Sequence, residues 1–236
     1  MRVTTAFLLS LLPTALSLAS PLRRQATNST SKIEIGPDDP TDPETTGYFI
    51  NYLSLNTNNL TRSMDFYTTV FGMRFMFTYH ITEYISITYM GHSQGGRNGS
   101  AYQSTREMIR NKQNAAGMIE LVYFNRTNIG GEPIPGGDKM TSTFNHIGMI
   151  VPDPPATQAR LEKYGVTIYK KLGARMPKDG PMGSPSILGD ASNLSPEAFE
   201  EIQEEFTKLN ALNIFAADPD GNLLEILPLN EPPMFE

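Results

Sequence analysis

Three side chains able to bind a metal or move a proton lie inside apolar stretches of this sequence. Glu120 lies in M-I-E-L-V-Y-F and Glu225 in L-L-E-I-L. His146, one of 3 histidines in 236 residues, opens the run I-G-M-I-V. Alternation along a strand would place Glu120 on the same face as Met118 and Val122. A carboxylate there is costly to bury without a partner, so each of the three residues needs one.

A metal ion is one partner that would satisfy all three side chains. Imidazole and carboxylate ligands suit Zn, Ni, Co, Mn or Fe(II) rather than a soft-metal site. The alternative is structural, because a single buried His usually has an ordinary hydrogen-bond partner and a single Glu usually faces solvent. Recurrence of the three residues at matching places in two similar halves favours the metal site. His80 and His92 are expected to be structural or exposed.

The first half, residues 47–126, is predicted to have the order β-α-β-β-β. Asn59 is placed to cap a helix that Gly72 ends. The spacing S-T-R-E at 104–107 predicts a capping box and a short helix. Aromatic and β-branched residues predict strands at 48–56, 74–80, 84–90 and 118–124.

The second half, residues 144–230, repeats this order after a Gly- and Pro-rich linker at 127–143. A helix at 155–164 ends at Gly165, and an insertion at 173–213 contains a helix with Ser195 as its cap. Asp218 and Asp220 belong to the turn D-P-D-G and are expected only to shape it. Strands are predicted at 146–151, 166–172, 214–217 and 223–227. The sequence therefore predicts an α+β fold of paired βαβββ modules with a helical insertion in the second module.

The N-terminus predicts a secreted, extracellular protein. Residues 1–19 have the charge, the short apolar run and the small residues of a signal peptide, and residues 20–46 read as a flexible leader. Sequons at Asn28, Asn59, Asn98, Asn125 and Asn193 predict a glycoprotein. Without cysteine, disulfides, thiol catalysis and thiolate metal sites are excluded. A net charge of −6 without a basic block predicts no nucleic-acid partner, and no other apolar run is long enough for a membrane.

Four motifs in this order resemble the vicinal oxygen chelate superfamily, and within it glyoxalase I (lactoylglutathione lyase). They are S-M-D-F-Y-x-x-V-F-G-M, I-E-L, F-N-H-I-G-M-I-V-P-D and D-P-D-G-N-L-L-E-I-L, and with the insertion left out they span 48–229. The resemblance implies a cup-shaped sheet around one metal, built across two modules of one chain or across a homodimer. Glu120, His146 and Glu225 match three of its four metal ligands, and Tyr52 falls at the fourth position, where the family has His or Gln.

The resemblance also implies a chemistry. A divalent metal, Zn or Ni, would bind two adjacent oxygens of a small-molecule substrate, and Glu225 would be both a ligand and the catalytic base of a lyase or isomerase. Lys170 and Lys171 match a basic stretch that holds glutathione. Three other positions depart from the glutathione-dependent enzymes, which argues against glutathione as the co-substrate: Asn56 and Ser142, where the family has basic residues, and Phe124, where it has Asn.

Other functions of the same fold stay open. An Fe(II) dioxygenase would need two histidines and one carboxylate, and only one histidine is suitably placed. A natural-product tailoring enzyme is a further alternative. A non-catalytic ligand-binding protein, like the bleomycin-resistance proteins, is favoured by Tyr52 at the first ligand position. The metal content of the protein would discriminate among these alternatives.

Overall fold

The structure of the protein is a computed structural model that describes residues 36–125, 132–135, 144–183 and 195–230. The chain divides into two compact units, Met1–Gly47 and Tyr48–Glu236. In the first unit, the 3₁₀ helix η1 (Pro43–Thr45) is capped by the side chain of Asp42. The predicted signal peptide, Ser142, and the sequons at Asn28 and Asn193 lie outside the described residues.

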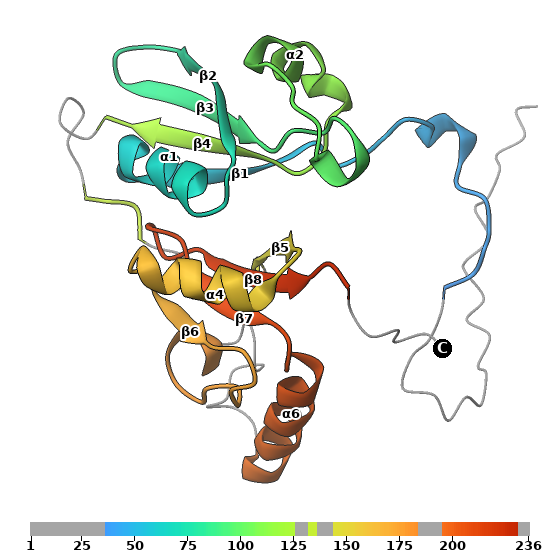
Figure 1. Cartoon of the computed structure of the whole chain (residues 1–236), viewed down its shortest axis with the longest axis vertical. Helices are drawn as coiled ribbons and strands as arrows, with labels where there is room; N and C mark the ends of the chain where they lie inside the picture. Colours follow the sequence, from blue (N-terminus) through green and yellow to red (C-terminus); the bar gives the residue numbers. More distant parts are fainter. Residues whose placement is uncertain (1–35, 126–131, 136–143, 184–194, 231–236) are drawn as a thin grey trace, which may run out of the picture. The chain divides into compact units, whose positions relative to one another are not determined.

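The first module has the predicted βαβββ order (Figure 1). Its sheet has the strand order β1-β4-β3-β2, with β1 parallel to β4 and the other pairs antiparallel. The elements are β1 (Tyr52–Thr57), α1 (Leu60–Thr69), β2 (Arg74–His80), β3 (Ile85–Gly91), α2 (Thr105–Arg110) and β4 (Met118–Phe124), with the 3₁₀ helices η2 (Arg97–Gly99) and η3 (Lys112–Asn114).

Local sequence signals account for the helix ends of this module. The Asn59 side chain accepts a hydrogen bond of 3.0 Å from the backbone N–H of Arg62 and begins α1. Gly72 follows α1 at φ +69°, in the left-handed region that glycine adopts without strain. Ser104 and Glu107 form the predicted capping box of α2.

The second module repeats the pairing pattern, with the strand order β5-β8-β7-β6 and β5 parallel to β8. The predicted α+β fold of paired βαβββ modules is confirmed, and the insertion contains the expected helix. Strand β6 is shorter than predicted, and its pairing with β7 shifts register between Ile168 and Lys170. The elements are β5 (Ile147–Val151), α4 (Pro154–Lys163), β6 (Ile168–Lys170), the 3₁₀ helix η5 (Gly180–Gly183), α6 (Pro196–Leu209), β7 (Ile214–Ala217) and β8 (Leu223–Pro228).

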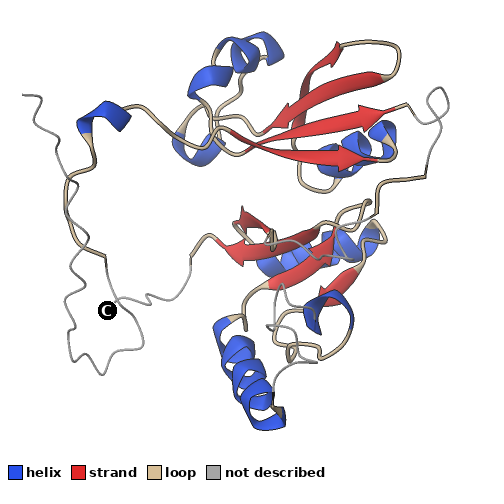
Figure 2. Ribbon diagram, turned by 180° about the vertical axis from the view of Figure 1, so that it is seen from behind, coloured by secondary structure: helices blue, strands red, loops and turns tan. Residues whose placement is uncertain are grey.

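Helices pack on both faces of each sheet. Figure 2 draws the strands in red and the helices in blue. On one face, Tyr67 of α1 packs on Ile119 and Leu121, and Leu161 of α4 packs on Ile226. Side chains alternate along a strand, so Met118 and Glu120 project from the face of the first sheet that is opposite α1. Glu225 projects from the face of the second sheet that is opposite α4. Those opposite faces are partly covered by α2 and by α6.

The turn between β7 and β8 is bound to the start of α1, which the sequence did not predict. Asp218 shapes the turn by accepting hydrogen bonds from the backbone N–H groups of Asp220 and Asn222, but it does more than expected, because its carboxylate also accepts a hydrogen bond of 2.9 Å from the Tyr67 hydroxyl of α1. Asp220 has a second role. Its carboxylate accepts hydrogen bonds from Thr57 Oγ1 at 2.7 Å, Ser63 Oγ at 3.0 Å and Arg62 Nη2 at 2.7 Å, and also from Asn58. The expectation that Asp220 only shapes the turn was wrong, because residues remote in sequence supply these donors.

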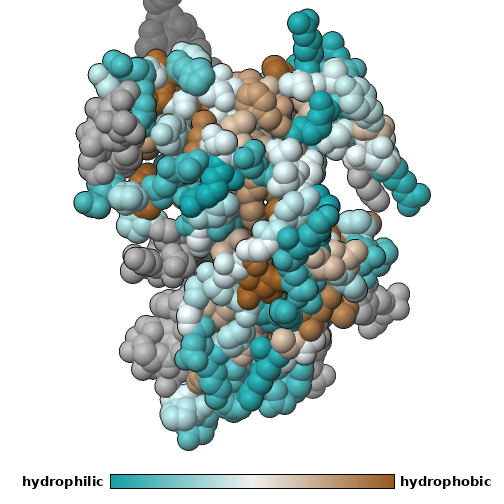
Figure 3. Space-filling model, turned by 60° about the vertical axis from the view of Figure 1, so that its left-hand side comes forward, coloured by the Kyte–Doolittle hydropathy of each residue, from teal (hydrophilic) through white to brown (hydrophobic). Residues whose placement is uncertain are grey.

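No helix among the described residues is long and apolar enough to span a bilayer. On the face shown in Figure 3, apolar (brown) and hydrophilic (teal) surface are interspersed.

Asp220→Ala should lower the free energy of unfolding by about 2–4 kcal/mol, because it leaves partly buried donors of β1 and α1 without their acceptor. Urea denaturation followed by circular dichroism measures the change. Asp65→Ala is the matched control, since Asp65 is an exposed residue of α1 and its side chain has no hydrogen bond within the described structure. Equal stability of the two variants would contradict the docking role of Asp220.

Candidate functional site

The second module brings two of the predicted site residues into contact. His146 directly precedes β5, Glu225 lies in the middle of β8, and His146 Nε2 is 2.8 Å from Glu225 Oε2. The other oxygen, Oε1, accepts a hydrogen bond of 2.9 Å from Asn213 Nδ2. The two side chains are 30% and 14% exposed, so the pair is partly open to solvent.

The environment of Glu225 keeps its carboxyl group ionised at neutral pH. Burial alone would raise its pKa, because it disfavours the charged form. The hydrogen bonds from His146 and Asn213, together with the electrostatic attraction of His146 and Lys170, outweigh burial and lower the pKa of Glu225 below its usual value. A carboxylate that is ionised and partly exposed can act as a metal ligand or as a base.

Lys170 lies behind this pair and is only 1% exposed. Its ammonium donates to the carbonyl oxygens of Asn210 at 2.7 Å, Asn213 at 2.9 Å and Lys171 at 3.2 Å. Asn210 is the C-cap residue of α6, so the buried charge fastens the end of the insertion beside Glu225. Burial lowers the pKa of Lys170 to about 8, against the opposing attraction of Glu225.

This environment contradicts the predicted role of Lys170 in holding a glutathione-like ligand. All three N–H groups of its ammonium already have carbonyl acceptors, because the insertion folds back over the residue. Lys171 is exposed and forms an ion pair of 2.8 Å with Glu162. Its predicted role stays a prediction.

The first module has a corresponding cluster with different chemistry. Strand register pairs Ser54 with Glu120 and Gly148 with Glu225, so Tyr52 and His146 occupy equivalent positions two residues earlier. Ser54 Oγ donates to Glu120 Oε1 at 2.8 Å. Tyr52 therefore lies on the Glu120 face.

Asn51, the neighbour of Tyr52, takes no part in this cluster. Its side chain instead donates to the carbonyl oxygens of Lys112 and Ala115. Since neighbouring side chains of a strand face opposite ways, this contact fits the register that puts Tyr52 beside Glu120.

Tyr89 of β3 completes the first-module cluster. Its ring makes an edge contact with Tyr52, with centroids 5.2 Å apart. Burial, followed by the hydrogen bonds to Glu120 and Tyr52, raises the pKa of the Tyr89 phenol well above its usual value. Tyr89 is thus a neutral hydrogen-bond donor, and two hydroxyl groups serve the Glu120 carboxylate.

The structure does not bring Glu120, His146 and Glu225 to one point within a chain. Among the described residues, no group of three or more His, Asp or Glu side chains could hold a metal ion. Of the two arrangements that the resemblance implies, a site within one chain is not formed among the described residues, in which Glu120 and Glu225 belong to two separate sheets, each with its own hydrogen-bond donors. A site across a homodimer stays a prediction. The module duplication therefore produces two half-sites, one with Tyr52 and Glu120 and one with His146 and Glu225.

Both half-sites have a helix packed on their own face of the sheet. In the second module, Phe199, Ile202 and Phe206 of α6 pack with Phe215 and Leu223, the neighbours of Glu225 on that face. In the first module, Met108 of α2 packs with Met118 and Tyr89. The sequence signals found both helices, but only the register of the strands shows which face they cover.

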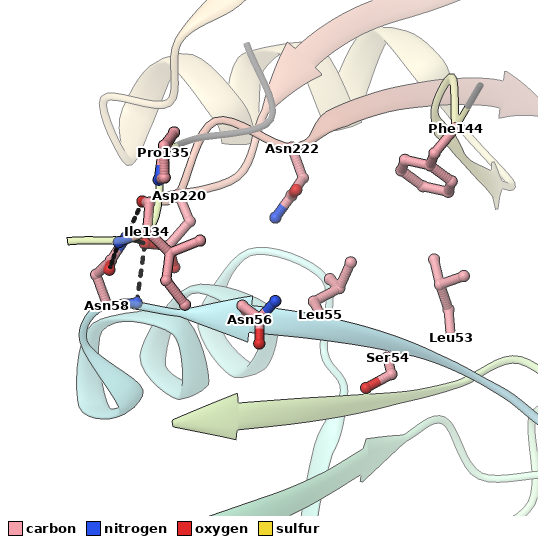
Figure 4. A pocket seen from close by; sticks show the side chains of 10 residues that line it. All are labelled: Leu53, Ser54, Leu55, Asn56, Asn58, Ile134, Pro135, Phe144, Asp220 and Asn222. Carbon is pink, nitrogen blue, oxygen red and sulfur yellow. Dashed lines mark hydrogen bonds between the residues drawn. The ribbon is translucent and has the colours of Figure 1, made fainter. Parts of the chain in front are cut away.

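A cavity of about 230 Å³ opens beside Ser54 (Figure 4). Its wall includes Asn56, Asn58 and Asn222, and the carboxamide of Asn58 pairs with the backbone N–H and C=O of Ile134. Phe144, two residues before His146, lines the same cavity. Carboxamide, hydroxyl and apolar groups, together with the carboxylate of Asp220, therefore line the space on this side of β1.

The family assignment follows from a match over the first module and the beginning of the second. The model of the Glyoxalase/Bleomycin resistance protein/Dioxygenase superfamily matches residues 49–180, more than half of the chain. The chain therefore belongs to this superfamily, as its motifs indicated. A comparison with curated proteins found no match.

Several solved structures are similar to this chain. The trypanothione-dependent glyoxalase I of Leishmania major is 18% identical with a TM-score of 0.44, over 77% of this chain and 86% of that one. Glyoxalase I of Zea mays is 15% identical with a TM-score of 0.45, over 78% of this chain and 46% of that one. TnmS3, an antibiotic-binding protein from Streptomyces sp. CB03234, is 14% identical with a TM-score of 0.40, over 77% and 95%. Likenesses of this size carry no argument about activity.

Lys170→Met should change how stability depends on pH. The unfolded chain, with a lysine pKa near 10.5, binds more protons above pH 8 than the folded chain, in which the pKa is about 8. Lys170 therefore makes the wild type more stable as the pH rises, by about 1–2 kcal/mol from about pH 8 to about pH 9.5. Urea denaturation at both pH values should show that Lys170→Met lacks this increment.

Lys171→Met is the control, since Lys171 is exposed and adjacent. It should keep the pH dependence of the wild type. An unaltered pH dependence in Lys170→Met would show that the Lys170 ammonium is not held as described.

Proposed function

We propose that the protein is a metal-dependent lyase or isomerase that acts on a small substrate with two adjacent oxygens, and that its site is completed in a homodimer. The contact of 2.8 Å between His146 Nε2 and Glu225 Oε2 carries this proposal. Ligands of one transition metal ion at 2.0–2.2 Å lie about 3 Å from each other, so the pair fits two neighbouring ligand positions. One chain supplies only these two ligands, His146 and Glu225, and a metal site needs three or four protein ligands.

Tyr52 and Glu120 of a second copy are the groups that would complete the set. They occupy in the first module the positions that His146 and Glu225 occupy in the second. Imidazole and carboxylate donors favour Zn or Ni. When bound, such an ion supplies Lewis acidity to the substrate oxygens.

In this proposal Glu225 moves the proton. Its pKa is held below its usual value by neighbouring donors and charges, so it is ionised and can accept a proton from a substrate carbon. The hydrogen bond from Asn213 to Oε1 orients the carboxylate. Glutathione is a poor candidate for the substrate, because Lys170 has no free N–H group and Asn56 stands where a basic residue would be expected.

A non-catalytic ligand-binding function is the second candidate, and Tyr52 is the observation that favours it. Tyr52 replaces an imidazole at the first ligand position and is hydrogen-bonded to Tyr89. Ser54 also donates a hydrogen bond to Glu120, so the carboxylate of the first half-site is satisfied by protein donors and does not need a metal ion. A metal-free protein that binds small molecules would support this alternative.

We also propose secretion, with residues 1–19 as the signal peptide and the sequons as glycosylation sites. The sequence pattern is the support. At Asn59 the side-chain oxygen caps α1, which leaves the amide nitrogen free for a glycan.

Glu225→Gln should lower turnover of a hemithioacetal formed with a small thiol other than glutathione by a factor of about 100 or more, because the amide cannot accept the substrate proton. The variant keeps the shape of the side chain, so its thermal midpoint should stay close to that of the wild type. Turnover is measured together with elemental analysis of the purified protein. Glu162→Gln, which alters an exposed glutamate, should keep full activity. Full turnover by Glu225→Gln would exclude the assigned base.

Mixing two inactive variants tests whether the site spans two copies. If sites combine Glu120 of one chain with Glu225 of another, a heterodimer of Glu120→Gln and Glu225→Gln contains one intact site and one doubly altered site. Unfolding and refolding the two together should restore activity to about a quarter of the wild-type value. Each variant refolded alone is the control, and a mixture as inactive as its components would contradict the shared site.

A further inference from the structure

A second cavity, of about 400 Å³, lies in the first module away from the His146–Glu225 pair. It lies among the end of β3, the start of β4 and the helix α2, and Gly91, Met108 and Met118 are among the residues that line it. The volume falls within the range of small-molecule sites.

Three buried methionines form the floor of this cavity. Met76, Met108 and Met118 are each at most 5% exposed. They converge on Gly91, where a Cβ atom would lie 3.3 Å from Met118 Cγ, 3.4 Å from Met76 Sδ and 3.7 Å from Met108 Cε. Thioether side chains are flexible and polarizable, so such a floor can adjust to apolar ligands of different shapes.

Uncharged polar groups form the rim. Gln94, Gln103, Asn111 and Asn114 contribute carboxamides, and His92 is the only titratable side chain among the described lining residues. Within the described part of the chain, the side chains of Asn111 and Asn114 have no hydrogen-bond partner, so both can bind a ligand. The absence of ammonium and guanidinium groups from this lining disfavours an anion.

Hydrogen bonds hold the wall in place. Arg74 donates to the carbonyl oxygen of Gln103 and to Thr105 Oγ1, and its guanidinium lies over the Tyr102 ring. The capping box fixes the start of α2, and Asn51 holds the loop before β4 through two carbonyl oxygens. A cavity held in this way does not have to be assembled by its ligand.

We propose that this cavity binds a small, uncharged molecule with an apolar body and a hydrogen-bonding edge. The apolar body lies on the methionine floor, and the edge bonds to the carboxamides of Asn111 and Asn114. The inference does not depend on the proposed lyase function, because none of the proposed site residues Tyr52, Glu120, His146 and Glu225 lines the cavity and its occupation needs no metal.

Two fluorescent probes with the same ring skeleton test this inference. N-phenyl-1-naphthylamine is neutral, and 8-anilino-1-naphthalenesulfonate carries one added sulfonate. The neutral probe should bind the metal-free protein at least about tenfold more tightly than the sulfonate. Titrations in about 0.5 M salt remove the general repulsion between the acidic chain and the anionic probe.

Asn114→Trp places a large side chain at the mouth of the cavity and should weaken binding of the neutral probe at least about tenfold. Gln113→Trp is the matched control on the same 3₁₀ helix, since Gln113 is exposed and does not line the cavity. The natural chain contains no tryptophan. The indole that Gln113→Trp introduces should therefore transfer energy to the bound probe and locate it.

Three results would overturn the inference: unchanged binding of the neutral probe to Asn114→Trp, equal affinity of the two probes in high salt, or no energy transfer in Gln113→Trp. If Asn114→Trp does not fold, Asn111→Trp, at the other unbonded carboxamide, decides in the same way.

Discussion

Each module has one carboxylate in the middle of an apolar strand, and the need to satisfy it organises the surrounding residues. Glu225 is served by His146 and Asn213, and its pKa falls below the usual value despite burial. Glu120 is served by the hydroxyl groups of Ser54 and Tyr89. The first set contains an imidazole and the second contains an aliphatic hydroxyl group and a phenol, so the two modules differ in chemistry although they share strand order and register.

This difference bears on function. His146, whose imidazole can bind a metal, and Tyr52, whose phenol is hydrogen-bonded, occupy equivalent positions in the two modules. This fits a metal site to which the second module contributes the stronger ligands. It also fits a protein in which catalysis has been replaced by ligand binding. The connections between strands also differ, because α2 lies between β3 and β4 whereas α6 lies between β6 and β7. Each helix nevertheless covers the face of its sheet that carries the carboxylate.

Two buried charged side chains outside the clusters of Glu120 and Glu225 stabilise the modules through direct hydrogen bonds. Asp220 ties the β7–β8 turn to the start of α1, and Lys170 ties the end of α6 to the strand beside Glu225. Both charges are satisfied by several hydrogen bonds, which is the condition under which a buried charge is tolerated. The insertion is therefore part of the second module's core, and Phe199 packs with Phe215 in it.

The sequence by itself determined the elements and the family. Period-two alternation, the caps at Asn59, Ser104 and Ser195, and the glycines after the helices are local signals, and all of them appear in the structure. It also singled out Glu120, His146 and Glu225, because a polar residue in an apolar strand is visible in one dimension. Only the tertiary structure decided that Glu120 stays apart from the other two, that Lys170 is enclosed by three carbonyl groups, and that Asp220 joins the two modules. The contact of Lys170 with Asn210 joins residues 40 positions apart and that of Asp220 with Thr57 joins residues 163 positions apart, so no local pattern in the sequence encodes them.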